Sequence, residues 1–266
     1  MPDTRPGLIF TENSICSACI NYEKQTTTNW DERFNELKKL CEKYRGTNGN
    51  GYDCAIAVSG GKDSHFQVYY MKEIMKMNPI LLAVGNTDWT ETGRKNLENL
   101  SDTFSCEILQ LNLNKNAARI IAKKSFEDMG QPTWYMDSLI YAYPYNMAMK
   151  LGLKLLVYGE NITYAYGGKF KTETPSAMLQ PFNDVVKTYP DEWLGVSGLS
   201  EKDLQSTIPP SVEDCKKSDL EPIYLSYFVP WDSHHNYQVA KRWGFQHLSH
   251  EYIREGSIEQ YNQIDS

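Results

Sequence analysis

The chain lacks the features of a membrane protein and of a secreted protein held together by disulfides. No apolar run in its 266 residues reaches roughly 18 residues, the length that a membrane-spanning helix needs. The first residues do not follow the charged-then-apolar plan of a signal peptide. Of its six cysteines only Cys16 and Cys19 lie close together, which is not the pattern of a disulfide framework. We therefore expect a cytoplasmic protein with no membrane partner.

Concentrated basic charge is also absent. The formal net charge is −7, and no stretch gathers Lys and Arg strongly. Because nucleic-acid partners usually require a basic face, we expect no nucleic-acid partner. The sequence has no internal repeat and no low-complexity tract. An apolar fraction of 41% in a chain of this length suits one large domain, or one domain with extensions.

Short apolar runs alternate with helical patterns in the middle of the chain. The runs predict strands at 54–58, 80–84, 107–111 and 155–158, with helices at 64–77, 90–104, 115–129 and 136–151. This alternation predicts an α/β fold of Rossmann-like type, in which helices cover both faces of a parallel sheet. Ligands of such sheets bind at the carboxyl ends of the strands, so we look for a site after Val58, Val84 and Tyr158.

The flanking regions read differently from the middle. Residues 1–28 are expected to be irregular, and a Gly- and Asn-rich linker separates an N-terminal segment, residues 1–50, from a nucleotide-binding domain, residues 51–266. Within that domain, residues 160–215 are rich in Gly, Pro, Thr and Tyr and are predicted to be a substrate-binding insertion. Further helices are expected at 30–45, 178–189 and 233–243.

The most informative segment, Val58-Ser59-Gly60-Gly61-Lys62-Asp63-Ser64, joins the first expected strand to the first expected helix. Its two glycines allow a tight turn that brings backbone N–H groups close to an anion. Ser59 and Ser64 add hydroxyl donors, and the helix adds the positive end of its dipole. Lys62 supplies a full charge, and Asp63 can hold Mg²⁺. The segment predicts a phosphate-binding site of a kind other than the GxxxxGK[ST] loop of the common NTPases.

This segment resembles the PP-loop, SGGxDS, of the ATP pyrophosphatase superfamily, whose fold is adenine nucleotide α hydrolase-like. Those enzymes cleave ATP between the α and β phosphates and leave AMP on an oxygen of the substrate. Over essentially the whole chain, the sequence is similar to the N-acetyl sugar amidotransferase family. The resemblance is carried, in order, by Pro2-Asp3-Thr4-Arg5-Pro6-Gly7, Cys16-Ser17-Ala18-Cys19, Trp30-Asp31-Glu32-Arg33, Tyr52-Asp53-Cys54, the Ser59–Ser64 loop, Thr92-Gly93-Arg94-Lys95-Asn96-Leu97, Tyr158-Gly159-Glu160-Asn161, Tyr227-Phe228-Val229-Pro230-Trp231 and Gln263-Ile264-Asp265-Ser266.

The resemblance implies a reaction in bacterial surface polysaccharide synthesis, that of lipopolysaccharide O-antigen or pseudaminic acid. An N-acetyl sugar, usually nucleotide-linked, has its acetamido group converted to an acetamidino group. ATP and Mg²⁺ are the implied cofactors, and a separate glutaminase subunit is the implied source of ammonia. The family carries a further Cys-x-x-Cys before the stretch that matches Met1-Pro2-Asp3, and it continues past the match to Ile264-Asp265-Ser266. We therefore expect a chain trimmed at both ends, with natural shortening as the alternative.

The resemblance also assigns roles to the loop and to the next strand end. Ser59, Gly60, Gly61 and Ser64 would hold the leaving pyrophosphate, while Lys62 and Asp63 would act in catalysis, Lys62 by neutralising charge and Asp63 by binding Mg²⁺. A solvated lysine and a carboxylate that stabilises only its helix dipole are the structural alternatives. Val84 and Gly85, with Asn86, would recognise adenine through their backbone, and an ordinary strand-end turn is the alternative.

Substrate binding is assigned to residues after the fourth strand and after the second. Glu160 and Asn161 could bind metal, phosphate or the sugar, and Tyr164, near Tyr166, Gly167 and Gly168, could stack on a sugar or a uracil ring. Arg94, with Thr92 and Asn96, could contact ATP or substrate. A turn with a solvated acid, a tyrosine that anchors a loop and a surface arginine are the alternatives.

Cys16 and Cys19 have zinc-knuckle spacing, but two ligands do not complete a tetrahedral site. In the full family member the upstream pair would complete a Cys₄ zinc site; here zinc would be absent or would need another ligand. Cys41, Cys54, Cys106 and Cys215 are interpreted as core residues. The pairs His234-His235 and His247-x-x-His250 have no supporting carboxylates and are not taken as metal ligands.

The sequence leaves two other functions open. An RNA-modifying PP-loop enzyme, such as a tRNA thiolase or a lysidine synthase, would begin with the same chemistry, and the acidic composition argues against it. A nucleotide-binding sensor on the same fold would need no turnover, and Lys62 and Asp63 within the loop argue against that alternative.

Overall fold

The computed structural model describes residues 7–49, 51–85, 89–165, 167, 173–182 and 195–248. Its centre is a five-stranded sheet with the order β3-β2-β1-β4-β5, in which every neighbouring pair is parallel. The strands are β1 (Cys54–Val58), β2 (Pro79–Val84), β3 (Ile108–Leu111), β4 (Leu155–Tyr158) and β5 (Glu221–Tyr224). The predicted α/β class is confirmed.

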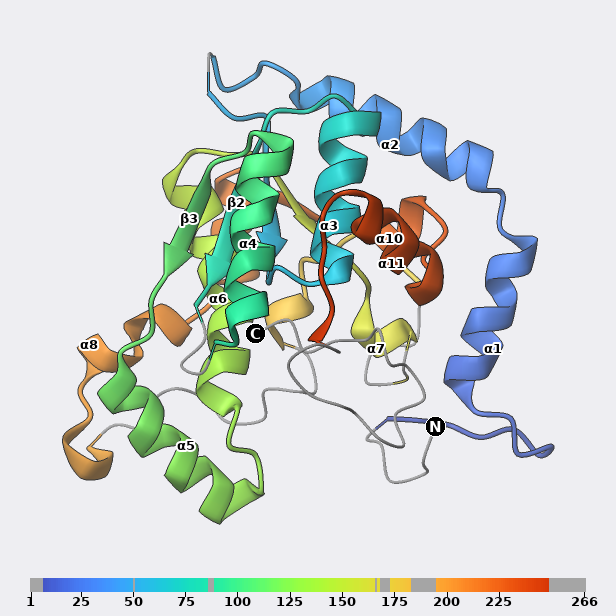
Figure 1. Cartoon of the computed structure of the whole chain (residues 1–266). Helices are drawn as coiled ribbons and strands as arrows, with labels where there is room; N and C mark the ends of the chain where they lie inside the picture. Colours follow the sequence, from blue (N-terminus) through green and yellow to red (C-terminus); the bar gives the residue numbers. More distant parts are fainter. Residues whose placement is uncertain are drawn as a thin grey trace.

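Alternate residues of the strands enter two different cores, as the two-residue period of a strand requires. On one face, Ile56 and Val157 pack with α3 (Lys62–Tyr69), α4 (Glu91–Phe104) and α11 (Ser233–Arg242). On the other face, Ala55 and Leu156 pack with α6 (Trp134–Lys150). Figure 1 shows α4 in front of the sheet and α6 behind it. Helices therefore cover both faces, which explains why the inner strands β1, β2 and β4 are apolar throughout.

A third core continues beyond the sheet. Val84 packs there with the buried faces of α5 (Lys115–Met129) and α6, and with Leu204 of α8 (Glu201–Leu204). The shorter elements are η1 (Gln25–Thr27), η2 (Tyr70–Ile74), α7 (Ile162–Ala165), η3 (Gln180–Phe182), η5 (Val196–Gly198), η6 (Gln205–Thr207), α9 (Val212–Lys217) and α10 (Leu225–Phe228). Within the described ranges, no helix is both long and apolar enough to cross a bilayer.

The N-terminal region contains two helices, α1 (Ser17–Lys24) and α2 (Trp30–Tyr44), which run along one side of the molecule in Figure 1. The expectation of irregular structure through residue 28 is therefore wrong. The Cys16 side chain caps α1 by accepting from the Cys19 N–H. Only Ala18 and Asn21 of α1 are buried, so the helix has no apolar stripe that its sequence could reveal.

The strands and helices predicted between residues 54 and 158 are confirmed, with ends that shift by two residues or fewer, except in α3. That helix begins at Lys62, ends at Tyr69, and continues as one wide π-helical segment, η2, rather than as a regular helix to residue 77. The helix predicted at 178–189 is represented in the described residues only by the 3₁₀ turn η3. The fifth strand, β5, was not predicted.

The order of the strands creates one crevice. From β1 the chain moves outward to β2 and β3, and then crosses back to β4 and β5 on the other side of β1. Such a reversal leaves a gap between the connections that follow the two central strands, and ligands of open α/β sheets bind there. The residues after Val58 and after Tyr158 meet at this point, as the sequence predicted.

Candidate active site

The Ser59–Ser64 loop turns tightly between β1 and α3. Gly60 has φ +93°, and a Cβ atom there would lie 3.1 Å from the backbone nitrogen of Leu97 in α4. Any other residue would therefore be strained and would collide with backbone. Ser59 N–H donates to the Ser64 hydroxyl at 2.9 Å, and Gly61 N–H donates to the Ser59 hydroxyl at 3.3 Å. The two serines thus fix the shape of the loop from within.

His65, which is fully buried, contacts the backbone of the loop at Gly61. Its Nδ1 lies 3.0 Å from the Gly61 carbonyl oxygen, and its Nε2 lies 3.0 Å from the Asn99 Nδ2. A carbonyl can only accept and this amide nitrogen can only donate, so the ring is neutral with its proton on Nδ1. Burial lowers the pKa of His65 to about 4, which keeps the ring neutral at physiological pH.

Lys62 and Asp63 form an ion pair at the start of α3. Lys62 Nζ lies 2.9 Å from Asp63 Oδ2, and the Lys62 side chain is 9% exposed. The other carboxylate oxygen, Asp63 Oδ1, accepts from the Asn236 Nδ2 at 2.8 Å. Asn236 belongs to α11 and is completely buried. Both oxygens of Asp63 are therefore held, one by a cation and one by a neutral amide.

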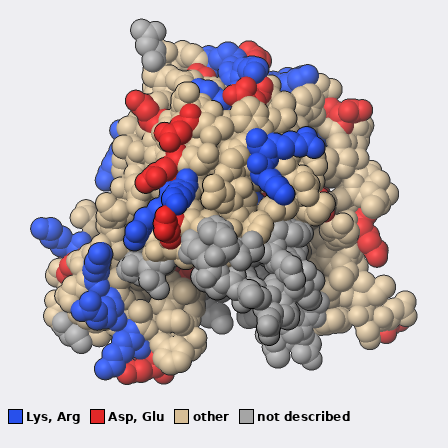
Figure 2. Space-filling model, in the orientation of Figure 1, with Lys and Arg blue, Asp and Glu red and all other residues tan. Residues whose placement is uncertain are grey.

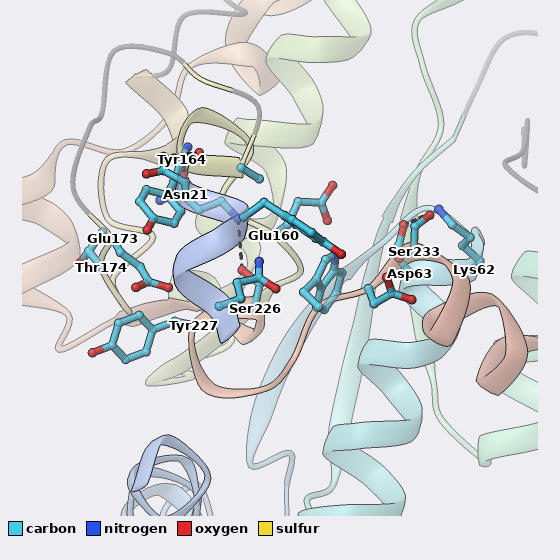
Figure 3. A pocket seen from close by; sticks show the side chains of 16 residues that line it. Asn21, Lys62, Asp63, Glu160, Tyr164, Glu173, Thr174, Ser226, Tyr227 and Ser233 are labelled. Atoms are coloured by element: carbon cyan, nitrogen blue, oxygen red, sulfur yellow. Dashed lines mark hydrogen bonds and ion pairs between the residues drawn. The ribbon is translucent and has the colours of Figure 1, made fainter. Parts of the chain in front are cut away.

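A cavity of about 700 Å³ opens beside this pair, with a size typical of small-molecule sites. Glu160, at the end of β4, is half-buried in it, and Figure 3 shows its carboxyl between the Lys62–Asp63 pair and Tyr164 with Glu173. The lining residues are Asn21, Tyr22, Gln25, Lys62, Asp63, Glu160, Asn161, Tyr164, Ala165, Glu173, Thr174, Ser226, Tyr227, Trp231, Asp232 and Ser233. The pKa of Glu160 is raised to about 7, mainly because burial removes hydration from the carboxylate and to a smaller extent because Asp63 is negatively charged.

A smaller cavity of about 260 Å³ lies on the α6 side of the loop. Its walls include the apolar side chains Leu82, Val84 and Pro144, together with the hydroxyl groups of Ser59 and Ser64. Asp63 and Glu160 line both cavities. These two carboxyl groups thus mark the place where the two cavities come together, directly beside the Ser59–Ser64 loop.

The far wall of the larger cavity is braced by Arg33 of α2. Its guanidinium donates to both carboxylate oxygens of Glu173, each at 2.8 Å, and to the Tyr227 carbonyl oxygen at 2.9 Å. It also lies 4.1 Å from the centroid of the Tyr227 ring. In addition, the Asn21 Nδ2 donates to the Tyr164 carbonyl oxygen at 2.9 Å, which joins α1 to α7. Segments far apart in the sequence therefore build one wall.

The structure brings most of the residues predicted for the site together. Those that line one or both of these cavities are Ser59, Lys62, Asp63, Ser64, Val84, Glu160, Asn161 and Tyr164, and Gly60 and Gly61 complete the loop. Asn161 also accepts from Thr163 and from the Tyr164 N–H, so it caps the short α7 as well as facing the cavity. Asn86, Tyr166 and Gly168 lie outside the described residues.

Two predicted residues lie elsewhere. Arg94 is exposed and lines a third cavity, of about 510 Å³, with Trp89 and Lys115 near the end of β3. It does not share a cavity with Glu160, Asn161 or Tyr164. Gly85 follows β2, where an added Cβ would lie 2.7 Å from the Gln110 Nε2. Its contact with a nucleotide and that of Arg94 with a substrate stay predictions.

Cys16 and Cys19 lie at the start of α1 with their sulfur atoms 3.2 Å apart. The hydrogen bond from the Cys19 N–H lowers the pKa of Cys16, and the shared sulfur contact raises that of Cys19. Among the described residues, no group of three or more His, Cys, Asp and Glu side chains is arranged to hold a metal. Zinc therefore stays a prediction, and His250 lies outside the described ranges.

Several lining residues were not singled out by the sequence. Asn21, Glu173 and Ser226 are polar residues in segments without a recognised phosphate-binding or metal-binding motif.

Asn236, which contacts Asp63 from outside the cavity, could have been singled out from the sequence, because it lies on the same buried face of α11 as Val239 and Ala240. A polar side chain on an apolar helix face needs a hydrogen-bond partner, and this partner turned out to be Asp63.

Comparisons with known proteins find only remote similarity. No family model matches the chain. It is 26% identical over 155 residues to an uncharacterized protein of Methanocaldococcus jannaschii, a match that covers 57% of this chain and 53% of the relative. The chain thus spans about half the length of the curated relative it matches.

Among solved structures, the chain is similar to a U34-tRNA thiolase from Methanococcus maripaludis with its [4Fe-4S] cluster, at 14% identity and a TM-score of 0.41, over 87% of this chain and 70% of that one. It is also similar to an NH₃-dependent NAD synthetase from Campylobacter jejuni, at 15% identity and a TM-score of 0.40, over 72% and 94% of the two chains. Similarity at this level identifies neither an activity nor a ligand for this chain.

Proposed function

We propose that this protein is an ATP-dependent amidotransferase that cleaves ATP between its α and β phosphates and converts an acetamido group of an N-acetyl sugar to an acetamidino group. The observation that carries this proposal is the position of the Ser59–Ser64 loop. It lies at the reversal of strand order, beside the place where Asp63 and Glu160 line two cavities at once. One cavity suits the nucleotide and the other suits the acceptor.

The smaller cavity is assigned to the nucleoside of ATP. Leu82, Val84 and Pro144 offer the apolar walls that a purine ring needs, and the serine hydroxyls lie where the phosphates would begin. The turn of the loop and the start of α3 direct backbone N–H groups toward the phosphates, as at other anion-binding helix starts. Lys62 would balance the charge that develops on the departing pyrophosphate.

The residues present suit a magnesium ion, which in such sites neutralises phosphate charge and aligns the leaving group. Asp63 and Glu160 bring two carboxyl groups to the junction of the cavities, and carboxylate oxygens together with phosphate are the ligands that Mg²⁺ prefers. The raised pKa of Glu160 fits this role, because a nearby cation would favour the ionised carboxylate that the apolar surroundings disfavour.

The larger cavity is assigned to the acceptor sugar. Trp231, Tyr227 and Tyr164 supply aromatic surfaces for stacking, and Asn161 and Ser226 supply hydrogen-bonding groups. An amide oxygen is a weak nucleophile, so the enzyme must hold it in line with the α phosphorus. Transfer of AMP to that oxygen releases pyrophosphate and forms an imidate. Ammonia then adds to the imidate carbon, and AMP leaves with the former amide oxygen.

The product sugar is proposed to serve the synthesis of a surface polysaccharide. The ammonia is proposed to come from a partner glutaminase. A glutaminase of the cysteine type needs an activated thiol. Five of the six cysteines have raised pKa values, and the sixth, Cys16, whose pKa is lowered, is buried with its sulfur against that of Cys19. None of them therefore suits a nucleophile for glutamine.

Mass spectrometry of a panel of UDP- and CMP-linked N-acetyl sugars, incubated with ATP, Mg²⁺ and ammonium, tests the proposal. A product lighter than its substrate by the difference between O and NH is expected for at least one sugar, and Asp63→Asn should abolish it. No such product on any sugar would refute the sugar reaction. Copurifying tRNA together with formation of a modified nucleoside would favour the RNA-modifying alternative instead.

A further inference from the structure

We propose that Asn236 is a positioning residue that holds the Asp63 carboxylate in place while Lys62 exchanges that carboxylate for the phosphates of the bound nucleotide. The inference rests on the proposed use of ATP and Mg²⁺ at this site. It assigns a role to α11, more than 170 residues after the loop in the sequence. No recognised nucleotide-binding motif includes this helix.

The contact geometry separates the two partners of Asp63. Lys62 Nζ approaches Oδ2 at 2.9 Å, and Asn236 Nδ2 approaches Oδ1 at 2.8 Å. Lys62 is the neighbouring residue in the chain and carries a flexible stem, so it can leave without disturbing the backbone. Asn236 has a short side chain on a packed helix and is completely buried, so it stays where it is.

The buried amide of Asn236 carries a cost that stability alone does not explain. Among the described residues, no group lies within hydrogen-bonding range of its Oδ1, although that atom is buried. Leaving a buried acceptor unpaired costs about 1–3 kcal/mol. The side chain must be oriented with Nδ2 toward Asp63, because the opposite orientation would place two oxygen acceptors against each other. The amide is thus held in a single orientation at an energetic cost.

The packing around Asn236 keeps that orientation. The Asp232 carboxylate caps α11 by accepting from the His235 N–H at 2.7 Å. The Phe66 ring of α3 meets the rings of Trp231 and His235 edge-on, with centroids 5.4 and 5.8 Å away. Helix α11 therefore packs against the same helix that carries Asp63, and the packing holds the amide beside the carboxylate.

A neutral donor suits a metal-binding carboxylate better than a second cation would. In the free protein, the ammonium of Lys62 neutralises Asp63, as the ion pair shows. When phosphates enter, Lys62 gains a stronger set of acceptors and releases Oδ2. The amide of Asn236 then keeps Oδ1 oriented while leaving the full negative charge of Asp63 available to the cation.

Binding of Mn²⁺, a paramagnetic substitute for Mg²⁺, tests the proposal without relying on turnover. Electron paramagnetic resonance would measure the Mn²⁺ affinity of the full chain with and without a non-hydrolysable α,β-methylene ATP analogue. With the analogue, Asn236→Ala should weaken Mn²⁺ binding by about tenfold, as loss of a hydrogen bond to a ligating side chain typically does. Gln238→Ala, an exposed residue on the same helix, is the matched control and should leave the affinity unchanged.

Lys62→Met should change the Mn²⁺ affinity in the opposite direction from Asn236→Ala. Without the analogue, removal of the competing ammonium should tighten Mn²⁺ binding, whereas affinity for the analogue itself should fall. A variant that merely loosened the fold would weaken both the binding of Mn²⁺ and the binding of the analogue. If Asn236→Ala does not fold, Asn236→Ser, which keeps a shorter donor, should show a smaller loss of Mn²⁺ affinity.

The failures of the two proposals are distinguishable. If the wild-type protein binds neither the analogue nor Mn²⁺, the proposed use of ATP is refuted. If the wild-type protein binds both, while Asn236→Ala or Asn236→Ser binds Mn²⁺ as tightly as the wild type, the role of Asn236 is refuted and the use of ATP stands. Weaker Mn²⁺ binding in Lys62→Met without nucleotide would refute the exchange.

Discussion

At the scale of single residues, the shape of the Ser59–Ser64 loop depends on residues outside its own motif. His65 donates to the Gly61 carbonyl and accepts from Asn99, and Gly60 leaves room for the backbone of Leu97. The sequence predicted the loop because two glycines and Lys62-Asp63-Ser64 stand between an apolar run and a helical pattern. It could not reveal His65 or Asn236, because their roles depend on helices that come close only in the folded chain.

The neutral state of His65 makes the fold sensitive to acid. The pKa of a histidine is about 6.5 in the unfolded chain, and burial lowers that of His65 to about 4. Between these values the unfolded chain binds the extra proton, so the free energy of unfolding should decrease as pH falls from 6.5 to 4. The decrease due to this residue is about 2 kcal/mol at pH 5. Urea unfolding at pH 7.5 and pH 5 would measure it.

His65→Gln should remove most of that additional loss of stability at pH 5, whatever its effect at pH 7.5. His235→Gln, at an exposed position, is the control and should retain the acid sensitivity of the wild type. Equal loss in wild type and His65→Gln between the two pH values would show that His65 is not held neutral by its surroundings.

At the scale of secondary-structure elements, the site depends on helices that pack across the ends of the strands. Periodicity predicted α4 and α5 well, because each has an apolar face, whereas α6 is apolar on most sides and contributes to two cores. It missed β5, whose short sequence Glu221-Pro222-Ile223-Tyr224 begins with two poor strand formers at the edge of the sheet. It also missed α1, which is short and mostly exposed and whose cap is a cysteine.

The ion pair between Arg33 of α2 and Glu173 should couple the N-terminal helices to the wall of the larger cavity. The pair is bidentate and its side chains are 17% and 28% exposed, so a double-mutant cycle with Arg33→Met and Glu173→Gln should give a coupling energy of about 1–2 kcal/mol. The measurement is urea unfolding of the four proteins. The exposed Lys124–Asp128 pair, in the same kind of cycle, should give about 0.5 kcal/mol or less. Equal coupling in both pairs would contradict a bracing role for Arg33.

At the scale of the whole molecule, two features bear on the proposed function: the order of the strands and the charge on the surface. The reversal between β1 and β4 places the loop and Glu160 side by side, which the sequence predicted from the ends of the strands alone. On the face drawn in Figure 2, Lys and Arg side chains lie in several separate places with Asp and Glu between them.

The wall of the larger cavity was the part of the site that the sequence predicted least well. Arg94 was grouped with Glu160 because both follow strands, yet α4 turns it into a separate cavity with Trp89. Glu173 and Tyr227 line the larger cavity from segments that the sequence places far from the loop. Contacts of this kind follow from how the connections fold over the sheet, and no local pattern encodes them.

The central claim is that the Ser59–Ser64 loop directs cleavage of ATP between the α and β phosphates. Phosphorus NMR of the nucleotide products, with the N-acetyl sugar panel and ammonium present, tests it most directly. AMP and pyrophosphate should form in equal amounts, and Lys62→Met should slow their formation by about 100-fold or more, the usual effect of losing a group that stabilises transition-state charge. Formation of ADP and inorganic phosphate, or an equal rate in the variant, would contradict the account.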